Sequence, residues 1–340
     1  MNPIVVDIGS SMKAGFAGDD EPRVIISSST DWKSSIQEGI VTDWVALELA
    51  LKDILDKLHG GTFHLEMAEK NQILVAVSPF QNHDRIKALL FDSFHFRSVH
   101  VTSSAVLPLF AQGLTSGLVV ECGEDVTFVA PTVEGILQTH LTRKFVVNGK
   151  DISEYLKKLL SFRTNSKSLY DTNTVDCIKS NFCYVAVDLE DEERLVKETN
   201  CLVENFSLPD GKIVKFAQER FECVEAFFEP SIIGEHVSGL SDFVFDLIQD
   251  ADIDIRAELY KHIVVSGGSS LFPGFIKRLQ KDINSRYLQD ILKGDTNRTM
   301  KFKINIEAPP NRRWLVFEGA SVLADLMKNK TEFWLQKQQD

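Results

Sequence analysis

A short pattern that occurs twice in the chain restricts its fold more than any other feature of the sequence. The first copy is VVDIGSS, residues 5–11, and the second is VVECGED, residues 119–125. In each copy an apolar run reaches an acidic residue and then a glycine, and a second short apolar stretch follows. This is the pattern of a strand, a tight turn and a returning strand. Because each copy opens a half of similar character, the two together predict a duplicated fold.

The rest of the sequence alternates short runs rich in Val, Ile and Phe with amphipathic segments. We predict strands at residues 3–7, 72–78, 98–102, 117–121, 126–131, 263–265 and 302–306. We predict helices at residues 43–58, 82–94, 152–160, 175–182, 240–251, 275–288 and 317–327. This mixed order indicates an α/β architecture with helices packed on the faces of sheets.

Two local predictions complete the outline of the chain. The serine-rich residues 27–35 are expected to form a surface loop. Gly319 is expected in the first turn of the last helix, where its missing side chain permits the close approach of another backbone.

The composition narrows the class of protein. Of the 340 residues, 44% are hydrophobic and 25% are charged, the mixture of a soluble globular protein. No apolar run is long enough to span a membrane and no secretory signal is visible, so we expect a cytoplasmic protein. The five cysteines are odd in number and lack CxxC spacing, which argues against a disulfide framework or a zinc site. The formal charge of −12 argues against a general nucleic-acid binder.

Three glycine turns are candidate contacts for a nucleotide. In the first, Gly9 lets the backbone approach a phosphate, and Ser10 and Ser11 can hold its oxygens through their amides and hydroxyls. Lys13 adds a positive charge, and Asp7 can hold Mg²⁺ through water. The same residue types also form ordinary turns, so this turn alone does not establish a phosphate site.

The second turn, around Gly123, is acidic. Its equivalence to the first turn favours a phosphate role, but Glu121, Glu124 and Asp125 would repel a phosphate unless a metal intervenes. The alternative is an acidic hairpin that keeps the fold and has lost the ligand. The sequence leaves both interpretations open.

The third turn lies in SGGSSLFPG, residues 266–274. An apolar strand leads into Gly267 and Gly268, and a helix is predicted to start near Pro273, because proline suits the first turn of a helix. Such a corner can receive a flat base or a phosphate without steric conflict. A tight strand-to-helix corner explains one pair of glycines but not its pairing with the two earlier turns. Three corners from two halves therefore predict a nucleotide held between lobes.

These residues resemble the actin family, in which two hairpins grip the phosphates of a nucleotide and a third corner holds the adenosine. KAGFAGDDEPR, residues 13–23, is very similar to the family's first hairpin. The likeness covers nearly the whole chain, and its C-terminal third resembles one class of actin-related protein in particular. The segments of the C-terminal third are ADIDIR (251–256), YKHIV (260–264), ILKGD (291–295), KFKI (301–304), VLADLM (322–327) and FW (333–334). Earlier in the chain the likeness includes HLTR (140–143) and SLPDG (207–211).

The resemblance implies a duplicated, ribonuclease-H-like α/β fold with two lobes around a nucleotide cleft. The first lobe would comprise residues 1–111 and 314–340, with a residual second subdomain near 26–40, and the second lobe residues 112–313, with the fourth subdomain at about 148–236. The small subdomain that overhangs the cleft would be largely absent, because the segment after Ile26 is much shorter than in the family. The hinge would lie near residues 104–112 and again near Arg313.

The resemblance also implies a cofactor, ATP or ADP with Mg²⁺, which Asp7 and Glu121 would hold through water. The residues that it places in the nucleotide site are Asp7, Gly9, Ser10, Ser11, Lys13, Glu121, Gly123, Lys179, Gly267, Gly268, Ser269, Leu271, Phe272 and Arg313.

The chain departs from the family where the phosphate would be cleaved. Ser104 replaces the glutamine that orients the attacking water, and Phe128 replaces a histidine. We therefore assign no catalytic residue and expect ATP binding with weak or absent hydrolysis. The other departures are a first phosphate loop one residue short between Met12 and Lys13, Glu121 for aspartate, Asp125 for the loop's last glycine, Ser180 for glutamate and Arg313 for lysine.

The function implied is that of an actin-like subunit in a cytoplasmic complex that nucleates branched actin filaments. Its partners would be actin-related protein 3, the other subunits of the complex and actin filaments, without nucleic acid or a membrane span. One alternative is a subunit of a nuclear or dynein-linked assembly, and another is a divergent ATPase. Sugar kinases and chaperone ATPases share the duplicated fold, but we find no carboxylate placed as a kinase base and no substrate-binding domain after the cleft.

Overall fold

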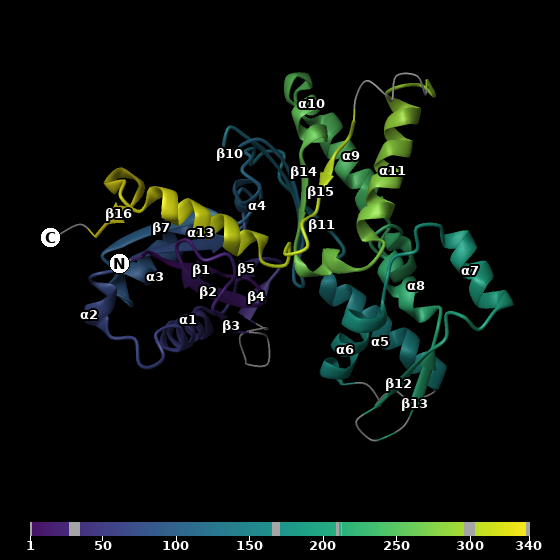
Figure 1. The fold of residues 1–340 in the computed structure, drawn as a ribbon, viewed down its shortest axis with the longest axis horizontal. Helices are drawn as coiled ribbons and strands as arrows, with labels where there is room; N and C mark the ends of the chain where they lie inside the picture. The colour runs from purple at the N-terminus through teal and green to yellow at the C-terminus, as the bar shows by residue number, and fades with distance from the viewer. Residues whose placement is uncertain are drawn as a thin grey trace.

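Two sheets of similar plan organise the molecule. The computed structural model describes residues 2–26, 35–164, 171–208, 211, 213–295 and 303–337. The first sheet has the strand order β16-β7-β6-β1-β2-β3 and the second the order β10-β9-β8-β14-β15, with β11 paired to β9. Figure 1 shows the first sheet on the left and the second near the centre, with both chain ends on the left.

The first sheet combines a parallel centre with an antiparallel hairpin. Strands β1, β6 and β7 run parallel, whereas β2 and β3 continue from β1 in antiparallel pairs and β16 adds to β7 in the antiparallel sense. The strands are β1 (Ile4–Asp7), β2 (Met12–Phe16), β3 (Val24–Ile26), β6 (Gln72–Val77), β7 (Ser98–Ser103) and β16 (Leu335–Gln336).

The second sheet repeats this plan. An antiparallel hairpin of β8 and β9 lies beside the parallel neighbours β14 and β15. The strands are β8 (Gly117–Cys122), β9 (Thr127–Val133), β10 (Ile136–Leu137), β11 (Arg143–Phe145), β14 (Ile263–Ser266) and β15 (Ile306–Glu307). The two copies of the sequence repeat thus form equivalent hairpins, β1–β2 and β8–β9, which confirms the duplicated α/β fold.

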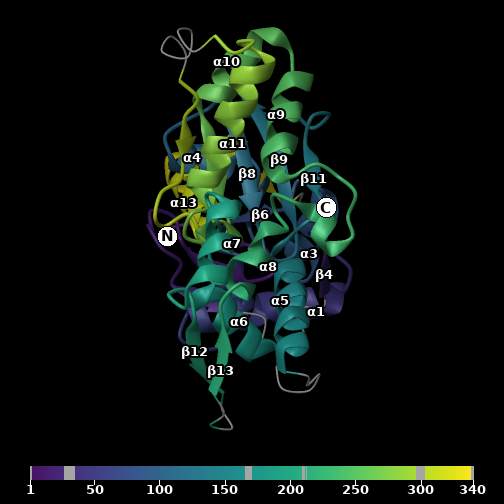
Figure 2. The ribbon, with the colours of Figure 1, turned by 90° about the vertical axis from the view of Figure 1, so that its right-hand side faces the viewer.

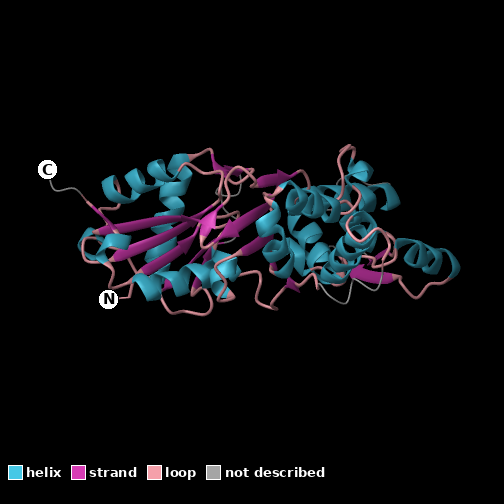
Figure 3. Cartoon of the chain, turned by 90° about the horizontal axis from the view of Figure 1, so that it is seen from above, coloured by secondary structure: helices cyan, strands magenta, loops and turns pink. Residues whose placement is uncertain are grey.

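Helices of the first half pack on both faces of its sheet, as Figure 3 shows. Helix α1 begins because the Asp43 side chain accepts hydrogen bonds from the amides of Val45 and Ala46, and its buried face includes Leu47 and Leu51. The helices are α1 (Trp44–Leu58), α2 (Leu65–Ala68), α3 (His83–Asp92), α4 (Leu107–Ala111), α13 (Leu315–Met327) and the 3-10 turn η4 (Thr331–Phe333).

The second half carries more helices, in two groups. In Figures 1 and 2, α9, α10 and α11 form one end of this half, and α5 to α7 with the hairpin β12–β13 form the other. The elements are α5 (Gly149–Thr164), α6 (Thr172–Phe182), α7 (Leu189–Glu198), β12 (Glu204–Ser207), β13 (Ile213–Phe216), α8 (Glu219–Glu225), η2 (Pro230–Ile233), α9 (Leu240–Asp250), α10 (Ile253–Lys261), η3 (Gly268–Leu271) and α11 (Phe275–Asp290).

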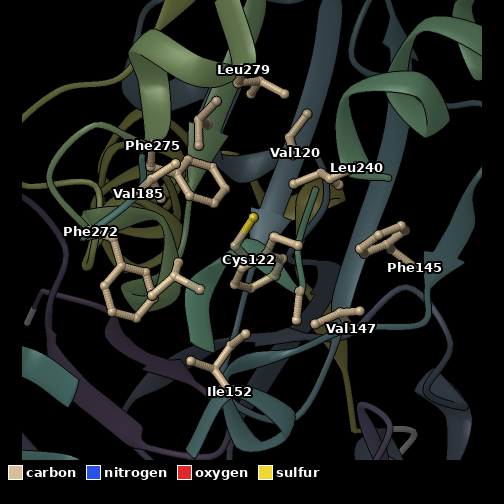
Figure 4. Close-up of a cluster of buried hydrophobic side chains, with 14 of the residues drawn as sticks. Val120, Cys122, Phe145, Val147, Ile152, Val185, Leu240, Phe272, Phe275 and Leu279 are labelled. Carbon is tan, nitrogen blue, oxygen red and sulfur yellow. The ribbon is translucent and has the colours of Figure 1, made fainter. Parts of the chain in front are cut away.

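Each half has its own hydrophobic core, and a third cluster lies under α13. In the second half, Figure 4 shows Val120 and Cys122 of β8 facing Leu240, Phe275 and other apolar side chains of one continuous cluster. Because side chains alternate along a strand, Glu121 between them points to the opposite side, toward the space between the halves. The core therefore fixes the direction of this acidic side chain.

The chain passes between the two sheets twice, and the two passages touch. The first follows β7 through α4, and the second follows β15 into α13. A Cβ atom added to Gly319 of α13 would lie 1.9 Å from the carbonyl oxygen of Leu107 in α4, so only glycine allows this contact. The predicted close approach is confirmed, although α13 begins at Leu315 and Gly319 lies beyond its first turn.

Some predicted boundaries were wrong. The strand predicted at 302–306 is only Ile306–Glu307 among the described residues, because β15 pairs with β14 over just two residues. Helix α5 begins at Gly149 rather than residue 152, because the Asn148 side chain accepts hydrogen bonds from the amides of Lys150 and Asp151. Residues 27–34 of the predicted loop lie outside the described residues, and the small hairpin of β4 (Ile36–Gln37) and β5 (Ile40–Val41) comes next in the chain.

Candidate nucleotide cleft

A cleft of about 490 Å³ lies between the two halves. Such a volume is in the range of small-molecule and cofactor sites. All three glycine turns contribute to its wall. The residues of the predicted site that line it are Asp7, Gly9, Ser10, Ser11, Lys13, Glu121, Gly123, Lys179, Gly267, Gly268, Ser269, Leu271, Phe272 and Arg313. The structure therefore brings together every residue that the sequence assigned to one site.

The first turn holds a buried ion pair. Lys13 Nζ donates to Asp7 Oδ2 over 2.6 Å, and the two residues face each other in the register of β1 and β2. Both side chains are almost fully buried, so each needs the other to offset its lost hydration. A phosphate that bound beside Gly9 would meet Lys13 already oriented by Asp7.

The second turn places a buried carboxylate in the cleft. Glu121 is the penultimate residue of β8, whereas Asp7 is the last residue of β1. Oε2 of Glu121 is buried without a hydrogen-bond partner in the described structure. Burial raises the pKa of Glu121 from its ordinary value of 4.5 to about 7; a hydrogen bond from Ser266 opposes this shift, and nearby Asp7 adds to it. A buried carboxylate oxygen without a partner suits a proton or a hydrated cation.

The donor set fits Mg²⁺ held mainly by water and phosphate. The described residues contain no group of three or more His, Cys, Asp or Glu side chains that could hold a metal directly. Mg²⁺ usually keeps several waters and binds one or two carboxylates together with substrate phosphates. Asp7 of β1 and Glu121 of β8 both line the cleft and would supply such carboxylates.

The third turn is a strand-to-helix corner fastened to the second turn. Gly267 has φ of 93°, and an added Cβ would lie 2.2 Å from the carbonyl oxygen of Cys122. Ser269 Oγ donates to the carbonyl of Gly123 over 3.0 Å. Gly268, in contrast, has no heavy atom within 4 Å of an added Cβ, so its face is open to the cleft. The helix predicted near Pro273, with bounds 275–288, is confirmed: α11 begins at Phe275, after the short 3-10 turn η3.

Lys179 lines the cleft but is engaged by protein groups. Its ammonium donates to Glu124 Oε2 over 2.9 Å, to the carbonyl of Gly149 over 3.1 Å and to Ser153 Oγ over 2.7 Å. These bonds use all three donors of a lysine. A ligand beside Lys179 would therefore contact a side chain whose charge is already paired.

Ser104 and Phe128, the two departures expected to weaken hydrolysis, both line the cleft. Ser104 is buried, and Phe128 is buried with its ring 6.0 Å from that of Phe80. A phenyl ring can neither orient a water molecule by hydrogen bonds nor exchange a proton. Among the described residues that line the cleft, none is a histidine.

Sequence reasoning missed part of the wall. Ser78, Gln81, Asp176 and Val316 line the cleft, as do residues of the hairpin β4–β5. No glycine turn or charge pattern distinguishes these positions, and they reach the cleft only through tertiary packing. Gln81 lies just before α3, and nothing in the sequence around it indicated a place in the cleft wall.

Comparison with known proteins agrees with this architecture. The sequence profile of the actin family, described as Actin, matches residues 28–339. The chain therefore belongs to the actin family.

Three relatives within the family are proteins named actin-related protein 2. The chain is 44% identical to that of Drosophila melanogaster over 264 residues, which are 77% of this chain and 66% of the relative. It is 44% identical to that of Acanthamoeba castellanii over 262 residues, 77% of this chain and 68% of the relative. It is 39% identical to that of Saccharomyces cerevisiae over 336 residues, 98% of this chain and 84% of the relative. No described helix is both long and apolar enough to cross a membrane.

Proposed function

We propose that this chain is one of two actin-like subunits in an assembly of the actin-related protein 2/3 type, which nucleates branched actin filaments. The similarity to three proteins named actin-related protein 2, over most of this chain, supports the proposal. Its partners would be actin-related protein 3, the other subunits and actin filaments, in the cytoplasmic cytoskeleton. The alternative is an actin-related subunit of another assembly, nuclear or dynein-linked.

Within that role the cleft would bind ATP or ADP with Mg²⁺. The observation that carries this proposal is the convergence of three glycine turns from two halves on one cavity of about 490 Å³. The first two turns would contact the phosphates, and the corner at Gly267 and Gly268 would receive the adenosine. Asp7 and Glu121 would hold Mg²⁺, which supplies positive charge against the phosphates. A ligand that contacts both halves would favour the closed state.

Hydrolysis would be weak or absent. Loss of a group that positions the attacking nucleophile typically costs on the order of 10² in rate or more. Ser104 and Phe128 line the cleft, and the resemblance places them where the family has such groups. The cleft would then act as a structural and regulatory site rather than as an ATPase.

Two experiments test these proposals separately. Affinity purification from the source cells should co-isolate an actin-related protein 3 and a propeller subunit, and nuclear remodelling or dynein-associated subunits in their place would select the alternative. Nucleotide extracted from the purified assembly should contain ATP or ADP. Single-turnover measurement with labelled ATP should show little phosphate release, and release at ordinary actin rates would overturn the prediction on hydrolysis.

A further inference from the structure

The hairpin β4–β5 leaves the first half and reaches the second across the cleft. Its base belongs to the first half, because the amide of Val41 donates to Gln81 Oε1 over 2.8 Å. Its tip, Glu38 and Gly39, has positive φ angles of 51° and 76°. Ile36, Gly39 and Val41 line the cleft.

The tip is bound to the second half by two polar contacts. The amide of Gly39 donates to Asp125 Oδ2 over 2.7 Å. Glu38 Oε2 forms an ion pair with Lys144 Nζ of β11 over 3.1 Å. Lys144 Nζ also lies 4.8 Å from the ring centre of Phe80, so it contacts two parts of the first half at once.

The tip of the hairpin is also tightly packed against both halves. A Cβ atom added to Gly39 would lie 2.6 Å from Ser78 Oγ of the first half and 3.1 Å from Val126 Cγ1 of the second. The tip is thus enclosed by both halves. Asp125 stands where the family has the last glycine of the second phosphate loop, and a glycine would offer no carboxylate there.

We propose that Asp125 is a positioning residue that fastens the hairpin β4–β5 to the second half and holds the cleft closed without a ligand. The bond between a backbone amide and a partly buried carboxylate is charge-assisted, and such bonds are the stronger kind in proteins. Asp125 is half-buried, and burial raises its pKa, against which the amides of Gly39 and Glu38 stabilise the charged form. The consequence for ligand exchange rests on the proposed nucleotide function: Asp125 would slow the entry and exit of ATP.

The first test needs no nucleotide. In nucleotide-free protein, amide hydrogen exchange of residues 36–41 should become at least about tenfold faster in Asp125→Ala, because the charge-assisted bond to Gly39 is lost. Asp125→Asn keeps a hydrogen-bond acceptor but not the charge. Its exchange rate over residues 36–41 should therefore lie between those of wild type and Asp125→Ala. Asp53→Ala is the matched control, since it breaks an exposed ion pair of 2.7 Å with Lys57 on α1. Unchanged exchange in a folded Asp125→Ala protein would overturn the proposal.

The second test uses ATP. Dissociation of a fluorescent ATP analogue should be about tenfold faster from Asp125→Ala than from wild type or Asp53→Ala. If wild type binds the analogue and Asp125→Ala releases it at the same rate, the positioning role is refuted while the nucleotide site stands. If wild type binds no analogue, the proposed function fails and hydrogen exchange alone decides the role of Asp125. Should Asp125→Ala not fold, Asp125→Asn supplies the same comparison, because it removes the charge from the bond to Gly39.

Discussion

Two adjacent glycines at the third corner have opposite steric environments. An added Cβ at Gly267 would meet backbone at 2.2 Å, and φ is 93°, whereas Gly268 has open space around it. We expect Gly267→Ala to lower the free energy of unfolding by about 2–4 kcal/mol, from backbone strain and overlap together. Gly268→Ala should change it by less than about 0.5 kcal/mol. Urea denaturation measures both, and equal effects would contradict the described corner.

Glu121 predicts how stability depends on pH in metal-free, nucleotide-free protein. Its pKa is about 7 in the folded state and 4.5 ordinarily, so between these values the folded protein keeps a proton that the unfolded chain releases. Stability should therefore fall as pH rises through this window, by up to about 3 kcal/mol from this residue. Because other carboxylates titrate too, the test is the difference between wild type and Glu121→Gln, whose slope should be flatter. Parallel slopes would show that Glu121 is ionised throughout.

The sequence predicted which residues lie in the site better than it predicted their hydrogen-bond partners. Gly9, Gly123 and Gly267 follow from local turn chemistry, which nearby residues determine. The pairing of Lys179 with Glu124 joins residues far apart in the chain, so no local pattern could reveal that this ammonium is already engaged. The partnerless oxygen of Glu121 likewise depends on the whole cleft.

The C-terminal strand β16 is an element whose docking should depend on pH. Nδ1 of His100 in β7 lies 3.0 Å from the carbonyl oxygen of Phe333, and the two rings stack at 3.8 Å. Burial lowers the pKa of His100 below its ordinary value of 6.5. The stabilisation from the neutral ring is therefore present above pH 6.5 and is lost as pH falls.

Hydrogen exchange measures this docking. After correction for intrinsic rates, exchange of residues 331–336 should increase between pH 7.5 and 5.5 in wild type by about threefold or more. His100→Phe keeps an aromatic ring but cannot titrate, so the increase should disappear. His140→Phe, a change at an exposed turn, is the control and should keep it. An increase that survives His100→Phe would assign the effect to another group.

Elements with strong periodicity were predictable, and those made by tertiary contact were not. Strands β1, β6 and β8 are continuous apolar runs, and α1 has a capping aspartate. Helix α7 has no buried residue, and each strand of β4–β5 has only two residues. Gln81 and Asp125 accept hydrogen bonds from the backbone of this hairpin, and no local sequence pattern could indicate these contacts.

For the whole molecule, ligand binding should raise stability through mass action. Mg-ATP at 100 times its Kd should add about 2.7 kcal/mol to the free energy of unfolding. The cleft wall includes the acidic residues Asp7, Glu121, Glu124, Asp125 and Asp176 against the basic residues Lys13, Lys179 and Arg313. ATP in the presence of EDTA should therefore raise the free energy of unfolding much less than Mg-ATP does. Calorimetry at matched concentrations measures this, and equal stabilisation without Mg²⁺ would argue against a metal in the cleft.

The duplicated architecture of the whole molecule was predictable, because the motif that forms each hairpin occurs twice in the sequence. We propose that the lobes follow the expected boundaries, 1–111 with 314–340 and 112–313. Limited proteolysis should then spare each lobe and cut exposed loops. The bridge that the hairpin makes across the cleft was not predictable, since it depends on how the halves meet.

The two passages of the chain between the sheets have a mechanical consequence. Bodies joined by one flexible tether can turn about any axis, whereas two tethers fixed side by side leave rotation about the line that joins them. At Gly319 and Leu107 the tethers are in backbone contact, and Leu109 and Leu315 pack in one apolar cluster. We expect these contacts to restrain twisting and sliding of the halves, so that the main remaining motion is rotation about one axis. A neighbouring subunit that contacts both halves could sense the state of the cleft by the angle of that rotation alone.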